Sequence, residues 1–333
     1  MDQHERTLLR ESIEQALTAV APESWTETLD DFGWHDLLEE DPQTAITEVA
    51  DLQGALLPRS SIINDSVMGT LPLDESVRST IPAPARFVFP PIGSMDPPGR
   101  TDAISDNCAV TVSGMVSTDS RPHGSLIIPA TDGNTPVLLV ITGPDELASL
   151  SGTPTAIEPD SGWVHISGSA IGTVVARGDA AVRLWTCAVR TAQLVLAQEL
   201  TTLGRRMLEL TVEHVASRKQ FGRPIGSFQS VKHGLADTRV EQETAELAIE
   251  AAWEQSDPEA AALAKLLAGK FFRSAAQHCQ QYLGGMGFTW EHPFHTFLRR
   301  GMILEQILGT TTVLRTQLGT AVRTGTIPVI GVL

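Results

Sequence analysis

The chain is poor in cysteine, in tyrosine and in basic side chains. Its 333 residues include three cysteines and one tyrosine, and 24 Lys and Arg residues stand against 40 Asp and Glu residues. Three scattered cysteines exclude a disulfide framework and a cysteine-based metal site, and they suit a reducing cytoplasm. The net charge of −16 argues against nucleic acid or an anionic membrane surface as a partner.

Long apolar runs are also missing. No stretch approaches the ~20 apolar residues that span a bilayer. Residues 1–6 are charged and lack the apolar core of a signal peptide. We therefore expect a cytoplasmic protein with no membrane segment. The content of 42% hydrophobic and 19% charged residues is typical of folded domains, and the length allows two or three of them.

Hydrophobic periodicity divides the chain into three parts. Residues 1–72 show apolar residues at helical spacing, with an Asp41-Pro42 helix start, and we expect an N-terminal helical domain. Residues 73–178 begin with a proline-rich window and continue as short β-branched runs, which predict a small β domain of antiparallel strands.

Residues 179–333 are helical in pattern almost throughout. One apolar stripe predicts a long helix that ends near Ser217, and a second helix is expected from about Phe228 to Trp253. A third begins at Asp257-Pro258 and ends at Gly284, and shorter helices are expected over 294–307 and 311–324. Long antiparallel helices joined by short turns predict a bundle.

The segment from Arg218 to Gln229 joins two of these helices. Its Phe-Gly and Pro residues are consistent with a plain connector between helices. The functional alternative is that Arg218 offers its planar cation to a diphosphate, a group that arginine binds well.

The stretch from Gln281 to His292 contains a Gly-Gly-x-Gly sequence. It could simply end a helix and turn at Pro293. Alternatively, Gly284, Gly285 and Gly287 let the backbone approach a nucleotide closely.

In order and spacing, these two motifs resemble those of the acyl-CoA dehydrogenase family. The resemblance is strong over residues 180–320 and weaker before them. It implies a mainly α fold with an N-terminal helical domain, a small barrel-like middle β domain and a C-terminal four-helix bundle. It also implies FAD as cofactor, shared across a subunit interface. The residues expected to bind FAD are Arg218, Gln220, Phe221, Gly222, Phe228, Gln229, Gln281, Gly284, Gly285 and Gly287.

The chain departs from the family at the base. Family members usually carry a glutamate twenty-four residues after the first glycine of the pair, and that position is Leu308 here. A second family position, twenty-nine residues before the Phe of Phe-Gly, is Ala192. Neither side chain can accept a proton. Glu199 or Glu305 could be a relocated base, but helix carboxylates are usually solvated, and we expect that of both.

The middle domain departs as well. The family segments that surround the flavin ring have only degenerate counterparts, Ser113-Gly114 and Thr118-Asp119. The chain thus keeps the motifs that contact FAD across a subunit interface, but it lacks the base and the flavin-ring segments of its own pocket. In this it resembles the shortened subunit of actinobacterial heteromeric dehydrogenases. This implies a full-length dehydrogenase subunit as partner in an α2β2 assembly, a bulky or steroid-derived acyl-CoA substrate, and electron-transfer flavoprotein as electron acceptor.

Two other functions stay open. The chain could be a self-sufficient homomeric dehydrogenase with Glu199 or Glu305 as base. It could also be a flavin-free scaffold that keeps its bundle for assembly. Other residues near the glycine motif have simple interpretations. His292 and His295 could cap a helix or lie at the surface, and Arg299-Arg300 could pair with the acidic surface or bind a phosphate.

Overall fold

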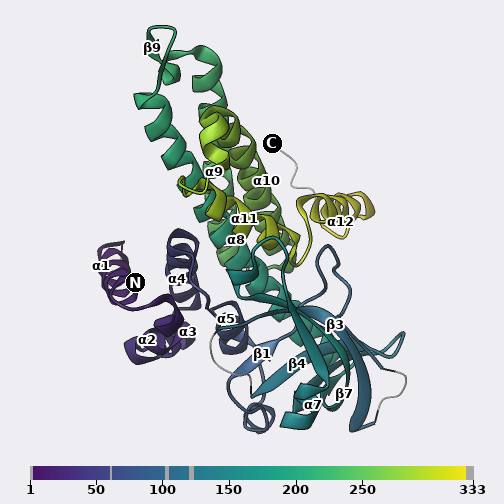
Figure 1. The fold of residues 1–333 in the computed structure, drawn as a ribbon. Coiled ribbons are helices and arrows are strands. Elements are labelled where there is room, and N and C mark those ends of the chain that lie inside the picture. Colours follow the sequence, from purple (N-terminus) through teal and green to yellow (C-terminus); the bar gives the residue numbers. More distant parts are fainter. Residues whose placement is uncertain (1–2, 61, 102–104, 120–123, 328–333) are drawn as a thin grey trace. The chain divides into compact units, whose positions relative to one another are not determined.

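The computed structural model describes residues 3–60, 62–101, 105–119 and 124–327. The chain divides into two compact units, Met1–Val195 and Leu196–Leu333, and the long helix α8 runs through the boundary (Figure 1). The three-part domain division expected from the sequence stays a prediction.

The N-terminal part of the first unit is helical, as predicted. Helix α4 begins where expected: the Asp41 side chain accepts a hydrogen bond from the Thr44 amide at 3.1 Å, and Pro42 occupies the first turn. Trp34 is buried and donates from its indole nitrogen to the Ala45 carbonyl, which ties α3 to α4. The elements are α1 (Gln3–Thr18), η1 (Pro22–Ser24), α2 (Trp25–Phe32), α3 (Trp34–Glu40), α4 (Pro42–Leu56), α5 (Ile62–Thr70) and α6 (Glu75–Arg78).

A seven-stranded sheet follows, with strand order β1-β4-β2-β3-β7-β5. An additional pairing of β4 with β5 closes a ring of strands, and β6 pairs with β7. Alternating buried positions along β3 point into an apolar core. The elements are β1 (Ala85–Phe87), β2 (Gly99–Arg100), β3 (Asn107–Ser117), β4 (Ser125–Thr131), β5 (Pro136–Thr142), α7 (Pro144–Ala148), β6 (Leu150–Pro154), η2 (Pro159–Ser161) and β7 (Trp163–Arg177).

The expectation of purely antiparallel strands is wrong for two short strands. The short strands β1 and β2 both run parallel to β4, whereas the longer pairings are antiparallel. Strand β1 lies in the proline-rich window, and β2 directly follows Pro98, the last proline of that window. The chain runs through a long connection between each of these short strands and β4, and a parallel pairing requires such a connection.

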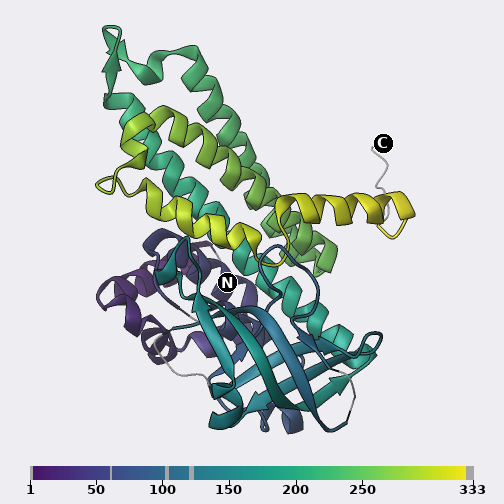
Figure 2. The same cartoon turned by 45° about the vertical axis from the view of Figure 1, so that its right-hand side comes forward.

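The helical half has the predicted order of helices. Asp257 caps α10 by accepting from the Glu259 amide, and Gly284 ends it with a φ of 57°. Figure 2 shows α12 extending away from the other helices of its unit, and Leu314 is its one buried residue. The elements are α8 (Asp179–Ser217), β8 (Lys219–Gln220), β9 (Arg223–Pro224), η3 (Ile225–Ser227), α9 (Gln229–Gln255), α10 (Pro258–Leu283), η4 (Gly284–Phe288), α11 (Phe294–Gln306) and α12 (Thr311–Thr324).

Close packing in this bundle depends on small residues. A Cβ on Gly204 of α8 would lie 2.6 Å from the Phe271 ring of α10, and one on Gly301 of α11 would lie 2.1 Å from Phe272. Both positions therefore have to be glycine for the helices to approach as they do. Among the described residues, no helix is both long enough and apolar enough to cross a membrane.

Candidate functional site

The connector after α8 is a tight hairpin. Strands β8 and β9 pair through Lys219 with Pro224 and Gln220 with Arg223, and the Ile225 amide donates to the Arg218 carbonyl at 2.8 Å. Phe221 and Gly222 form the tip with φ values of 52° and 78°. A left-handed conformation is uncommon for phenylalanine, so the backbone holds Phe221 in an unusual position.

An exposed aromatic side chain marks the tip of the hairpin. Phe221 is 91% exposed and meets the Phe228 ring edge-on, with 6.1 Å between the ring centroids. The Arg223 guanidinium lies over the other aromatic ring, 4.2 Å from the Phe228 centroid. Aromatic and cationic groups are therefore presented together.

The hairpin is basic in an otherwise acidic chain. No Asp or Glu occurs between His214 and Asp237. Such a local excess of positive charge attracts an anion even though the net charge of the chain is −16. The basic side chains of this segment are Arg218, Lys219, Arg223 and Lys232.

The glycine motif forms the turn after α10. A Cβ built on Gly284 or Gly285 would meet nothing within 4 Å, so this backbone is open to the approach of a ligand. Gly287 differs, because it is buried and a Cβ there would lie 2.7 Å from the side-chain amide of Gln280. Two of the three glycines thus leave space, and the third is closely surrounded by side chains.

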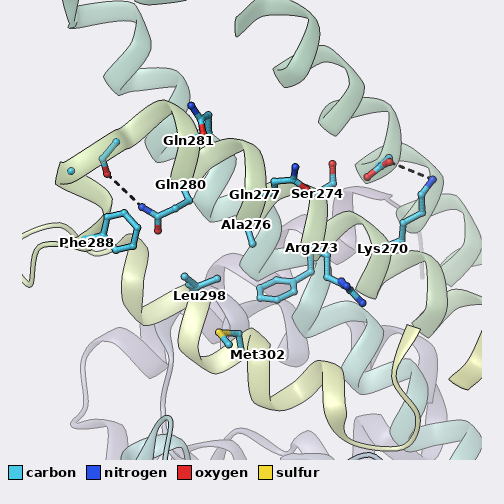
Figure 3. A pocket seen from close by; sticks show the side chains of 14 residues that line it. Lys270, Arg273, Ser274, Ala276, Gln277, Gln280, Gln281, Phe288, Leu298 and Met302 are labelled. Atoms are coloured by element: carbon cyan, nitrogen blue, oxygen red, sulfur yellow. Dashed lines mark hydrogen bonds and ion pairs between the residues drawn. The ribbon is translucent and has the colours of Figure 1, made fainter. Parts of the chain in front are cut away.

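An open groove of about 1040 Å³ runs along α10 to this turn. Figure 3 shows its two walls: amide and charged groups of α10 on one side, and the apolar side chains of Phe288, Leu298 and Met302 on the other. Of the residues expected to bind FAD, the groove contains Gln281, Gly284 and Gly285. The full lining is Glu241, Lys270, Phe272, Arg273, Ser274, Ala276, Gln277, Gln280, Gln281, Gly284, Gly285, Phe288, Leu298 and Met302.

The end of α8 is electrostatically coupled to the loop after the glycine turn. Burial lowers the pKa of His214, and the nearby charges of His292 and Arg218 lower it further. His214 and Arg218, four residues apart at the end of α8, thus lie near enough to His292 to interact with its charge. The sequence carries no signal for His214, because its role comes from this tertiary proximity.

The other side chains of this loop make contacts within the protein. His292 accepts a hydrogen bond from the Phe294 amide through Nδ1, so it caps α11 as expected. Trp290 is 77% exposed, meets the His295 ring edge-on and carries the Arg299 guanidinium over its face.

The two positions where the family carries a base hold inert, buried side chains. Leu308 and Ala192 are both 0% exposed. Leu308 has a φ of 53° and is followed by Gly309 with a φ of 94°. A left-handed leucine is strained, and such strain persists only where surrounding bonds fix the backbone.

Those bonds come from a buried lysine. Lys265 of α10 is 2% exposed, and its Nζ donates to the Gly309 carbonyl at 2.6 Å and to the Glu305 carbonyl at 3.3 Å. Burial lowers the pKa of Lys265 to about 7, and the charge of Glu305 opposes this shift. Nothing in the sequence pattern singles out Lys265, because its partners lie forty residues further on.

The expectation that Glu199 and Glu305 are solvated is wrong. Glu199 is 1% exposed, and one of its oxygens accepts from Nε of the buried Arg300 at 2.5 Å. Glu305 is 5% exposed and accepts from the Thr311 amide at 2.9 Å, with an Arg273 nitrogen 3.9 Å away. A buried carboxylate needs such partners. Arg300 is thereby committed to an internal ion pair rather than to a phosphate.

The two middle-domain segments, Ser113-Gly114 and Thr118-Asp119, also make internal contacts. A Cβ on Gly114 would lie 2.4 Å from the Phe89 carbonyl oxygen, so β3 is closed at this point. Asp119 accepts from the fully buried Arg86 at 2.6 Å and from the Thr26 hydroxyl at 3.1 Å. Within the described parts of the chain, no group of His, Cys, Asp and Glu side chains could hold a metal ion.

Comparison with known proteins agrees with these observations. Residues 189–322 match the family described as acyl-CoA dehydrogenase, C-terminal domain. The chain is 42% identical over 118 residues to acyl-CoA dehydrogenase IpdE2 of Mycobacterium tuberculosis, covering 35% of this chain and 37% of that protein. It is 30% identical over 262 residues to acyl-CoA dehydrogenase FadE34 of the same organism, covering 71% of this chain and 35% of that protein. The matches therefore span little more than a third of these relatives.

Solved structures show the same fold over nearly the whole chain. The steroid ACAD Tcur3481-Tcur3483 superposes with a TM-score of 0.79 at 19% identity, covering 97% of this chain and 99% of that chain. The ChsE4-ChsE5 complex from Mycobacterium tuberculosis gives a TM-score of 0.72 at 19% identity, covering 97% of this chain and 98% of that chain. The expected fold class is confirmed.

Lys265 makes the stability of the protein depend on pH in a defined window. Its pKa is about 7 in the folded state and 10.5 ordinarily, so between these values the folded state holds fewer protons than the unfolded state. The free energy of unfolding should therefore rise with pH across this window, by up to about 1.4 kcal/mol per pH unit. Denaturant titrations at several pH values should show a shallower rise for Lys265→Met. Equal slopes in both proteins would contradict the assignment.

Proposed function

We propose that this chain, a member of the acyl-CoA dehydrogenase family by its C-terminal domain and its fold, is a subunit of a heteromeric FAD-dependent dehydrogenase that supplies no base itself. One contrast carries the proposal. The hairpin and the glycine turn are exposed and able to receive an anionic nucleotide, whereas positions 308 and 192 hold buried apolar side chains. The chain thus keeps the exposed hairpin and glycine turn but has no base at either position to take the substrate proton.

The residues present fit the nucleotide end of FAD. Arg218 on the basic hairpin would bind the diphosphate, and Gln281 with the open backbone of Gly284 and Gly285 would bind the adenosine part. Gln220, Phe221, Gly222, Phe228 and Gln229 complete the proposed set. FAD, when bound, supplies hydride acceptance in α,β-dehydrogenation of a CoA thioester.

The proton in this reaction has to be taken by the partner subunit. A base must reach the α-carbon of the thioester, and Leu308 and Ala192 cannot accept a proton. The partner we propose is a full-length dehydrogenase subunit in an α2β2 assembly, with electron-transfer flavoprotein as acceptor, in the cytoplasm. The ChsE4-ChsE5 structure, described as a complex, supports a partner of this kind.

The proposed substrate is the CoA ester of a bulky, steroid-derived acid. Support comes from the structural likeness to a protein described as a steroid ACAD. The rival homomeric enzyme is disfavoured by the geometry, because Glu199 and Glu305 are both buried and engaged by internal donors. The other alternative is a flavin-free scaffold.

Expression alone and with a partner tests the proposal most directly. We expect the chain alone to be inactive on acyl-CoA, and its complex with a dehydrogenase subunit to be yellow and active. FAD content and turnover with an artificial electron acceptor measure this. Ordinary turnover by the solitary chain would show a homomeric enzyme. An active complex whose FAD content does not depend on the presence of this chain would show a scaffold.

Arg218→Ala should weaken FAD binding. A charge-assisted contact to the diphosphate implies a loss of affinity of about tenfold to a hundredfold. FAD titration of the cofactor-depleted complex measures it. Arg205→Ala, which removes a cation from the preceding helix outside the hairpin, is the matched control and should leave the affinity unchanged.

Leu308→Glu should not create a homomeric enzyme. Position 308 is 0% exposed and left-handed, so a carboxylate there would be buried without a designed partner and should lower stability. We expect a reduced melting temperature and no turnover without a partner. Measurable turnover by this variant alone would overturn our account of the site.

A further inference from the structure

Polar residues join α9 to α10 where these helices approach the two motifs. The Thr238 hydroxyl lies 2.8 Å from Nδ1 of His278. The His278 ring is stacked with the Tyr282 ring, 6.1 Å apart at an interplanar angle of 8°. The Tyr282 hydroxyl then donates to the carbonyl oxygen of Ser230 at 3.2 Å.

A glycine makes room for this last bond. A Cβ on Gly234 would lie 2.0 Å from the Tyr282 hydroxyl oxygen, closer than any real contact. Any larger residue at 234 would therefore push the hydroxyl off the Ser230 carbonyl. Gly234 and Tyr282 form a matched pair.

The bond lies between the two proposed FAD segments. Ser230 follows Gln229, the first residue of α9, which comes directly after the hairpin. Tyr282 follows Gln281, whose side chain lines the groove (Figure 3), and precedes the glycine turn. A single hydroxyl thus connects segments 52 residues apart in the sequence.

The start of α9 is tied to the hairpin by the Phe228 ring, which contacts Phe221 and Arg223. Its N-cap residue is Phe228, which makes no side-chain capping hydrogen bond. The first amides of an uncapped helix lack partners, and such an end frays easily. A restraint from the neighbouring helix would hold this turn in place.

We propose that Tyr282 is a positioning residue for the nucleotide site, fixing the first turn of α9 and the attached hairpin against Gln281 and the glycine turn. This inference rests on the proposed function, in which these segments bind FAD. Tyr282 itself acts through Gln229 and Gln281 and need not touch the ligand.

The first test is FAD affinity of the cofactor-depleted complex. Tyr282→Phe removes only the hydroxyl, and we expect affinity to fall about threefold to tenfold, the range of one hydrogen bond. In a Gln229→Ala background the same change should have less effect, because both act on one contact. Additive losses would overturn the positioning role. Ile249 is buried on α9 away from the site, so the control Ile249→Val should lower stability without changing FAD affinity.

The matched pair gives a rescue test. Gly234→Ala should weaken FAD binding by displacing the hydroxyl, and adding Tyr282→Phe should recover part of the affinity by relieving the clash. Failure of the second change to recover any affinity would count against the pairing.

Spectroscopy gives a readout independent of activity. The chain has one tyrosine, so fluorotyrosine labelling of this chain, assembled with an unlabelled partner, yields a single fluorine resonance. We expect this resonance to shift as FAD is added, in step with saturation, and an unmoved resonance at saturation would contradict the proposal. If Arg218→Ala weakens FAD binding and Tyr282→Phe does not, the positioning role fails and the proposed function stands. If neither change weakens binding, the proposed function fails.

Discussion

The antiparallel packing of α9 against α10 is the constraint on which the candidate site depends. It brings the hairpin at residues 218–228 to the same end of the bundle as the glycine turn, although Tyr282 and Ser230 are 52 residues apart in the chain. The approach is close because Gly234 has no side chain. Toward its other end the same contact is apolar, with buried Ala245 and Ile249. Apolar packing supplies stability there, and directional hydrogen bonds set the geometry near the site.

A second constraint acts on the turn between α11 and α12. Lys265 and Glu305 bind its backbone from both sides, so a left-handed Leu308 is held in the interior. Both polar groups are buried and satisfied, which is the condition for keeping ionisable groups in a core. The turn is therefore strongly ordered although position 308 lacks an ionisable group.

Helix ends and motif positions could be predicted because their causes are local. Asp41 and Asp257 cap helices through amides two or three residues away, and Gly284 ends α10 through its own backbone angles. The burial of Glu199 and Glu305 could not be predicted. Their partners, Arg300 and the Thr311 amide, reach them only after the helices pack. The parallel pairing of β1 and β2 with β4 was missed for the same reason.

Residue types and their spacing were enough to predict the order of helices and strands, the basic hairpin, the glycine turn and the absence of a carboxylate at 308 and 192. These features follow from residue type, spacing and backbone preference, which act over a few residues. Three features became visible only in the folded chain: Lys265 holds the turn at 308, both candidate carboxylates are internal, and Tyr282 links the two motifs. Each of these depends on a buried polar group meeting a partner distant in the chain, and that meeting is fixed by packing rather than by pattern.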